Sequence, residues 1–258
     1  MSLADIRSKG KQKPPRIILY GGAGIGKTTF ASMMPNPIFI LTEDGMGTIQ
    51  ANQFPLCPAF EKEKEHEDDK HLGVMQRLRE LIEEDHEFKT VVIDSIDWLE
   101  PMIWDKACQD NGWKSLEQPG YGKGYFEALK YWRQYLDLLN VLREEKGMIT
   151  LQIGHHQIKR FESPEIEPYD RYEPKLHRKA CDLVMENSDC VFFANYKMGT
   201  VKKQGKGGLN TKAVQGDAVV YCREKPSHLA KNRYALPDFL PFEWSKIREA
   251  MIGEKKDG

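Results

Sequence analysis

The chain has 258 residues, of which 40% are hydrophobic and 30% are charged. This length and composition suffice to bury a core and exclude a wholly disordered chain. Its 38 Lys and Arg against 39 Asp and Glu give a formal net charge of -1, so a polyanionic partner would have to be held by local basic patches. No apolar run approaches the ~18 residues of a membrane span, and residues 1–16 are polar and basic, unlike a signal peptide. We therefore expect a cytoplasmic protein without a membrane partner.

The cysteines do not suggest a disulfide framework or a zinc site. Five cysteines occur, at positions 57, 108, 181, 190 and 222, and none forms a C-x-x-C pair. We expect reduced and mostly buried thiols. The spacing of His155, His156, His177 and Cys181 matches no known metal-binding pattern.

Apolar runs and helical periodicity alternate along the chain. We expect strands at 16–20, 38–41, 90–93, 148–153, 189–196 and 218–222, and several of these are the continuous apolar runs typical of a parallel sheet covered on both faces. Helices are expected at 27–34, 73–84, 125–142 and near 245–251. The charge-dense stretch 61–71 indicates a solvated loop or helix start, and 157–175 and 197–217 are expected to be irregular. The alternation predicts an α/β fold with a mostly parallel sheet flanked by helices.

A phosphate-binding loop is the strongest signal in the chain. Residues 21–28 match G-x-x-x-x-G-K-[ST] in full, directly after an expected strand and before an expected helix. In this motif, backbone N–H groups and the helix N-terminus face the phosphates, Lys27 reaches the β- and γ-phosphates, and the Thr28 hydroxyl coordinates Mg²⁺. The predicted nucleotide-binding residues are Gly21, Gly22, Ala23, Gly24, Ile25, Gly26, Lys27, Thr28 and Thr29. The expected cofactors are ATP and Mg²⁺.

Polar residues follow three other expected strands, at the edge where the phosphate loop should lie. Asp94 ends the run 91–93 and is the candidate Walker B carboxylate, the second magnesium-binding residue with Thr28. Glu43 follows the run 38–41 as the candidate that orients the attacking water, with Asp44 as the competing residue. After the run 148–153, His155 or His156 is placed to sense the γ-phosphate.

Four segments make the chain resemble a RecA-family recombinase core, and specifically the short phage-encoded RecA-like ATPases of single-strand annealing. They are GGAGIGKTT at 21–29, FILTED at 39–44, VVIDSIDWL at 91–99 and LAKNRYALPDF at 229–239. The resemblance implies a single RecA-like P-loop NTPase domain over 16–252, between a basic leader at 1–15 and a tail at 253–258. It also implies that Glu43 is the catalytic base, and that Lys231 and Arg233 reach the ATP of a neighbouring subunit in a homo-oligomeric ring or filament.

The resemblance also assigns a partner, single-stranded DNA, to the two stretches expected to be irregular. The stretch 157–175 takes the place of the family's second DNA-binding loop, where cations and aromatic rings suit a single-stranded backbone and its bases. Lysines of 197–216, a segment without acidic residues, add candidate phosphate contacts, with a solvated flexible hairpin as the alternative for this segment. The predicted DNA-binding residues are Lys159, Arg160, Phe161, Arg171, Tyr172, Lys175, Lys202, Lys203 and Lys206.

The implied function is therefore an Mg-ATP-dependent, single-stranded-DNA-binding ATPase of phage recombination, annealing or repair, with a single-strand-binding protein as a further partner. The chain lacks an evident N-terminal aromatic and alanine motif for hooking subunits together and an extra C-terminal domain, which favours annealing over strand exchange. Two alternatives stay open. One is a P-loop small-molecule phosphotransferase, although 197–216 lacks the arginines of a typical lid, and the other is a nucleotide-dependent loader of a replication protein.

Overall fold

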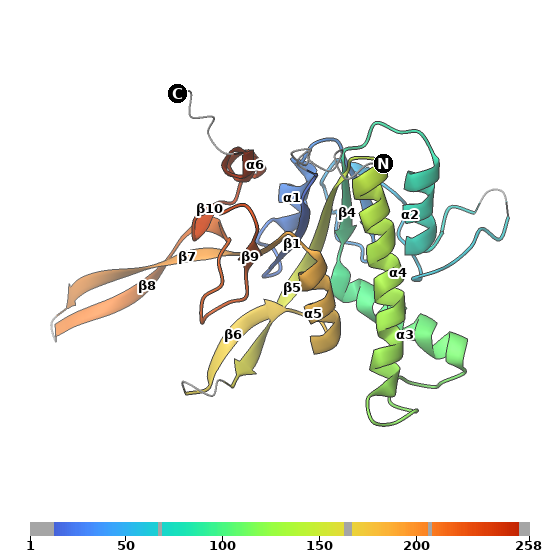
Figure 1. The fold of residues 1–258 in the computed structure, drawn as a ribbon. Coiled ribbons are helices and arrows are strands. Elements are labelled where there is room, and N and C mark those ends of the chain that lie inside the picture. Colours follow the sequence, from blue (N-terminus) through green and yellow to red (C-terminus); the bar gives the residue numbers. More distant parts are fainter. Residues whose placement is uncertain (1–12, 67–68, 163–166, 206–207, 253–258) are drawn as a thin grey trace, which may run out of the picture.

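A computed structural model describes residues 13–66, 69–162, 167–205 and 208–252 (Figure 1). Its strands are β1 (Arg16–Gly21), β2 (Pro37–Leu41), β3 (Asn52–Gln53), β4 (Thr90–Asp94), β5 (Ile149–Phe161), β6 (Tyr169–Pro174), β7 (Cys190–Gly205), β8 (Gly208–Tyr221), β9 (Lys231–Asn232) and β10 (Phe239–Pro241). Its helices are α1 (Lys27–Ser32), α2 (Val74–Glu83), α3 (Ile96–Asn111), α4 (Lys123–Glu145), α5 (Arg178–Asn187) and α6 (Trp244–Ile252).

The strands form one sheet in the order β10-β8-β7-β1-β5-β4-β2-β3, with β6 paired to β5 and β9 to β7. Pairing is parallel from β3 through β2, β4, β5 and β1 to β7, and antiparallel beyond β7. The central strands β1 and β4 are buried along nearly their whole length because their apolar runs are covered on both faces. The expected α/β fold with a mostly parallel sheet flanked by helices is confirmed.

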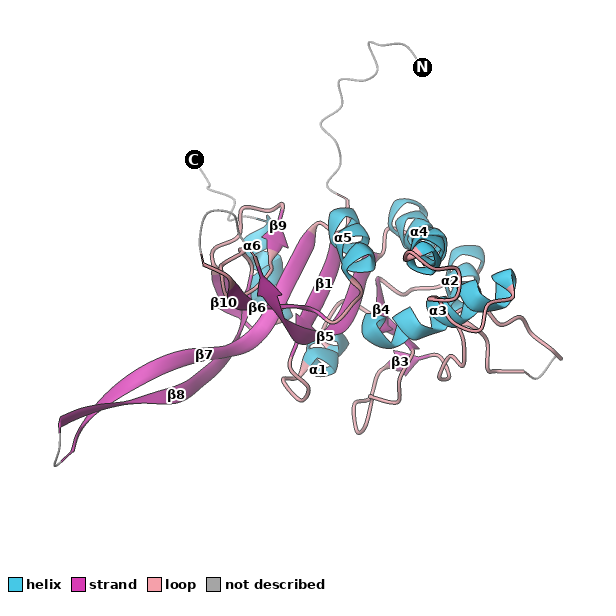
Figure 2. Cartoon of the chain, turned by 90° about the horizontal axis from the view of Figure 1, so that it is seen from below, coloured by secondary structure: helices cyan, strands magenta, loops and turns pink. Residues whose placement is uncertain are grey.

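Alternate residues of the central strands belong to two separate hydrophobic cores. Ile18 and Tyr20 of β1 belong to the core that packs against α2, α3, α4 and α5. Ile17 and Leu19 belong to the core that packs against α1 and α6. The period of two along a strand therefore places helices on both faces of the sheet (Figure 2).

The carboxyl ends of the parallel strands meet at one edge of the sheet. In the paired registers, Gly21 at the end of β1 lies beside His155 of β5, and Asp94 at the end of β4 lies beside Leu41 of β2. The chain leaves these ends through the loops that carry the predicted phosphate-binding and acidic residues. A shared site at this edge follows directly from the parallel order.

The described part of 157–175 belongs to an antiparallel hairpin, so the expectation of an irregular stretch was wrong there, whereas the described part of 197–217 forms a hairpin, the alternative expected for it. β5 runs on past the parallel sheet and pairs with β6, and β7 pairs with β8 as a long ribbon that projects from the body (Figure 2). The β5–β6 hairpin has no continuous apolar run in its sequence, because cross-strand backbone hydrogen bonds hold it. The residues 61–66 and 69–71 lie in a loop, one of the two states expected for them.

Two helices have no counterpart among the expected elements. α3 contains Pro101 and has apolar residues beside its buried stripe of Ile96, Leu99, Ile103 and Ala107, and α5 is only ten residues long. No helix within the described ranges is both long and apolar enough to cross a bilayer.

Candidate active site at the carboxyl edge of the sheet

The loop between β1 and α1 has a backbone shape that requires glycine. Gly24 and Gly26 have φ angles of 74° and 98°, in the left-handed region that residues with a Cβ atom seldom adopt. At Gly21, a Cβ would come within 2.4 Å of the Ala194 carbonyl oxygen, so a side chain there would push β1 away from β7. The glycines thus leave a compact loop with its backbone open to a phosphate.

The side chain of Lys27, the first residue of α1, points back toward the backbone of this loop. Its side chain is buried, and its Nζ donates to the carbonyl oxygens of Gly21 (3.2 Å) and Gly22 (2.9 Å). Burial lowers the pKa of Lys27, while the nearby carboxylates of Asp94, Asp97 and Glu43 oppose that shift. A phosphate in the loop would give this ammonium an anionic partner in place of two neutral carbonyls.

The side chains of Thr28 and Asp94 are in direct contact, as the phosphate-loop motif requires. The Thr28 hydroxyl donates to Oδ2 of Asp94 at 2.8 Å. Burial raises the pKa of Asp94, and the hydrogen bond from Thr28 and the charge of Lys27 act in the opposite direction. The paired oxygen groups fit Mg²⁺, a hard cation that prefers oxygen ligands. Thr28 and Asp94 would hold the ion, which when bound supplies neutralising charge to nucleotide phosphates.

Glu43 faces the same cavity and is held by a residue that the sequence analysis gave no role. Its Oε1 accepts a hydrogen bond from the Ser95 hydroxyl at 2.6 Å. Ser95 is fixed in turn by Thr42, whose Oγ1 accepts from the Ser95 N–H (2.8 Å) and donates to its carbonyl oxygen (2.7 Å). Asp44 is exposed and does not line the cavity. The geometry therefore places Glu43, and not Asp44, beside the phosphate loop.

The two histidines after the parallel part of β5 point into different environments. His155 lines the cavity and contacts Asp97 of α3, with Nδ1 at 3.0 Å from Oδ2. His156 packs edge-on against Tyr172, with ring centroids 5.0 Å apart. Burial alone would raise the pKa of Asp97, but the hydrogen bonds from His155 outweigh it and hold that pKa below its usual value. Only His155 of this pair is placed to meet a nucleotide.

These groups surround one cavity of about 300 Å³. Its lining comes from the loop before α1, the residue after β2, the end of β4 and His155 of β5. The lining residues are Ala23, Gly24, Gly26, Lys27, Thr28, Thr29, Glu43, Gly45, Ile49, Asp94 and His155. A carboxylate, a cation, a hydroxyl and an imidazole thus converge on a Gly-rich loop, which suits binding and hydrolysis of a nucleoside triphosphate.

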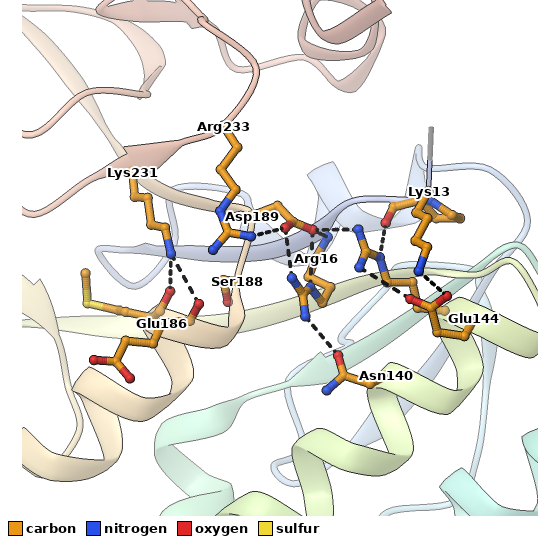
Figure 3. Close-up of polar contacts among 12 residues, drawn as sticks. Lys13, Arg16, Asn140, Glu144, Glu186, Ser188, Asp189, Lys231 and Arg233 are labelled. Carbon is orange, nitrogen blue, oxygen red and sulfur yellow. Dashed lines mark hydrogen bonds and ion pairs between the residues drawn. The ribbon is translucent and has the colours of Figure 1, made fainter. Parts of the chain in front are cut away.

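Lys231 and Arg233 lie away from this cavity, near the amino ends of β1 and β7 (Figure 3). Lys231 Nζ donates to the carbonyl oxygens of Met185 (2.8 Å) and Glu186 (3.3 Å) at the end of α5. Arg233 Nη1 donates to Oδ1 of Asp189 at 3.1 Å. The structure does not bring these two residues to the nucleotide cavity of their own chain.

Asp189 is the centre of a cluster with Arg16 (Figure 3), and Arg143 also belongs to this cluster. Arg16 donates to both oxygens of Asp189, from Nε at 3.2 Å and from Nη2 at 2.9 Å, and Arg143 Nη2 donates at 3.2 Å. The side chains of Arg16 and Arg143 are 15% and 13% exposed, whereas that of Arg233 is 53% exposed. Arg233 is therefore the outermost of three arginines that share one carboxylate.

Four of the predicted DNA-binding residues gather around a groove between the β5–β6 hairpin and α5. Lys159, Arg160, Phe161 and Arg171 all line it, and the Arg171 guanidinium lies over the Phe161 ring at 4.1 Å. The volume of the groove is about 390 Å³. A cation next to an aromatic face is the combination that stacks bases and contacts phosphates in single-stranded nucleic acid.

The remaining predicted DNA-binding residues lie elsewhere. Tyr172 stacks on Phe193 with ring centroids 5.1 Å apart, and Lys175 is exposed just after β6. Lys202 and Lys203 lie in the part of β7 where the structure describes the backbone alone, and Lys206 falls outside the described residues.

Comparison with known proteins gives one family match. A family model described as an AAA domain matches residues 13–234. No curated protein matches the chain. Among solved structures, the chain is similar to one described as the crystal structure of the RadB recombinase, with 15% sequence identity and a TM-score of 0.41, covering 86% of this chain and 87% of that chain. The family match includes every residue that lines the cavity.

Proposed function

The chain belongs to the AAA domain family, and from that membership and the cavity we propose that it is an Mg-ATP-dependent ATPase whose turnover is linked to single-stranded DNA. The observation that carries the proposal is the convergence of Lys27, Thr28, Glu43, Asp94 and His155 on one Gly-rich loop. In this proposal Lys27 binds the β- and γ-phosphates, Glu43 accepts a proton from the attacking water, and His155 contacts the γ-phosphate.

The proposed biological setting is phage DNA recombination, single-strand annealing or repair in the cytoplasm of a bacterial host, with a single-strand-binding protein as a further partner. The groove beside the β5–β6 hairpin supports DNA as the partner, because it combines Lys159, Arg160 and Arg171 with the ring of Phe161. Acidic residues Glu162 and Glu173 also line it, so binding should be modest and should weaken as salt rises.

We also propose a homo-oligomer, a ring or a filament, with ATP at the subunit interface. Arg233 supports this part, since its half-exposed guanidinium lies at the end of the sheet opposite its own phosphate loop. An arginine in that position can serve a nucleotide only on another subunit.

The test is steady-state ATP hydrolysis with and without single-stranded DNA at two salt concentrations. Lys27→Ala is the blank for the ATPase site, and Arg160→Ala probes the groove. We expect DNA to stimulate wild-type turnover, the stimulation to fade at high salt and to shrink in Arg160→Ala, and Lys27→Ala to be inactive. Turnover without any DNA stimulation would refute the DNA link and leave the ATPase.

A further inference from the structure

Asp97 is a buried carboxylate directly behind the nucleotide cavity, and both of its oxygens contact His155. Its Oδ1 accepts from the backbone N–H of His155 at 3.0 Å, and its Oδ2 lies 3.0 Å from the ring Nδ1. The Asp97 side chain is 2% exposed, whereas that of His155 is 28% exposed. The histidine thus has one side tied to a rigid helix and the other side open to the cavity.

This contact fixes the orientation of the imidazole ring and determines which ring nitrogen faces the cavity. An ionised carboxylate only accepts hydrogen bonds, so the proton on Nδ1 must point at Asp97. A flip of the ring would remove the Nδ1–H donor and leave Oδ2 of Asp97 buried without it, which is costly. Nε2 is therefore the ring nitrogen that remains for a ligand in the cavity, in the way that a carboxylate behind a metal-bound histidine orients that ring.

The charges around His155 come from α3, β4, α1 and the loop after β2, besides β5 itself. Asp97 lies on α3, Asp94 ends β4, and Lys27 with Glu43 lines the facing wall of the cavity. Asp97 is the one carboxylate of this group in hydrogen-bond contact with the ring within the described part of the chain. A γ-phosphate brought in beside Lys27 would place a second anion on the opposite side of the imidazole from Asp97.

We propose that Asp97 is a positioning residue that holds His155 with Nε2 directed at the γ-phosphate, and that this pair makes the site prefer ATP to ADP. The inference deepens the proposed function and rests on it. Asp97 touches no substrate itself and acts through His155. In the proposed contact both ring nitrogens carry protons, so that Nδ1 donates to Asp97 and Nε2 donates to the phosphate. The arrangement works because a hydrogen bond to a charged phosphate is strong only when the donor is held in place.

The test compares the affinities for a non-hydrolysable ATP analogue and for ADP, both with Mg²⁺, by isothermal titration calorimetry. We expect Asp97→Asn to bind the ATP analogue about tenfold or more weakly, as expected for a charge-assisted hydrogen bond. Its affinity for ADP should stay within about twofold of wild type, since ADP lacks the group that His155 contacts. The control is Asp105→Asn, the same change at an exposed position of α3, which should alter neither affinity.

A second pair of variants tests whether Asp97 acts through the imidazole. His155→Gln keeps a neutral N–H donor, so adding Asp97→Asn to it should change the affinity for the ATP analogue little beyond the effect of His155→Gln. Equal weakening for ATP analogue and ADP in Asp97→Asn, or an undiminished effect of Asp97→Asn in the His155→Gln background, would refute the inference. A wild-type chain that binds neither nucleotide would refute the proposed function itself.

Discussion

Replacement of Asp189 by Asn should destabilise the fold strongly, because it removes the buried carboxylate that two mostly buried arginines share. Arg16 and Arg143 direct three side-chain hydrogen bonds at this carboxylate. Besides these, Arg16 contacts the neutral side chain of Asn140, and Arg143 contacts the Pro14 carbonyl and, at 3.7 Å, the half-exposed carboxylate of Glu144. Breaking a buried ion pair by removing one partner costs about 3–5 kcal/mol. Asn keeps one accepting oxygen, so we expect about 3 kcal/mol.

Arg233→Ala provides the matched comparison at the same carboxylate. Its side chain is 53% exposed, and it contributes one of the hydrogen bonds to Asp189. Exposed ion pairs are worth about 0–1 kcal/mol, so its removal should cost less than about 1 kcal/mol and leave Asp189 with the two buried arginines. For Asp189→Asn, the expected loss of about 3 kcal/mol corresponds to a fall in Tm of about 6–12 °C for a chain of this size.

The assay is urea and thermal unfolding followed by circular dichroism, with both variants at the same protein concentration. The pKa of Asp189 is lowered because the arginines outweigh its burial. A carboxylate with a lowered folded pKa stabilises the fold above its unfolded pKa and loses that effect as the pH falls through the folded value. The difference between wild type and Asp189→Asn should therefore be constant near neutrality and should close below about pH 4. Equal costs for the two variants, or less than about 1 kcal/mol for Asp189→Asn, would refute the reasoning.

Three more outcomes follow from the same structure. Glu43→Gln should lower ATP turnover about 100-fold or more while nucleotide binding, measured by calorimetry, stays intact; unchanged turnover would exclude Glu43 as the base. Gly21→Ala should cost about 1–3 kcal/mol in urea unfolding, because the added Cβ meets the Ala194 carbonyl oxygen at 2.4 Å; a neutral effect would contradict the close approach. Burial raises the pKa of Glu100 from 4.5 to about 7, so the folded state binds the extra proton and stability should fall as pH rises between these values. Glu100→Gln should flatten the dependence of stability on pH, measured by urea unfolding across this range, and an unchanged profile would contradict the raised pKa of Glu100.

Much of the nucleotide site could be predicted from the sequence because its chemistry is local. The phosphate loop needs glycines, a lysine and a threonine at fixed spacing, and that spacing is visible without a structure. Asp94, Glu43 and His155 were also located, since parallel strands with apolar runs must end at one edge and each of these residues follows such a run. The choice between Glu43 and Asp44 needed the structure, because neighbouring residues after a strand point in different directions.

The contacts that hold the site together could not be predicted in the same way. Ser95 and Asp97 follow the strand of Asp94 within a few residues, yet their partners Glu43 and His155 are more than fifty residues away along the chain. Such pairs depend on strand order and register, which apolar periodicity does not reveal. The hairpin of β5 and β6 was missed for a related reason, since its pairing extends beyond the buried core and needs no apolar run.

The ribbon of β7 and β8 can change in length without altering the central part of the sheet. A register shift between Tyr196 and Met198 separates the ribbon from the portion of β7 that pairs within the main sheet. Deleting the two facing pairs Val201 with Lys212 and Lys202 with Thr211 would preserve the pairing pattern of the remaining residues, because a strand repeats every two residues. Homologous chains could thus lengthen or shorten the arm in steps of about 7 Å, with no cost to the geometry around the phosphate loop.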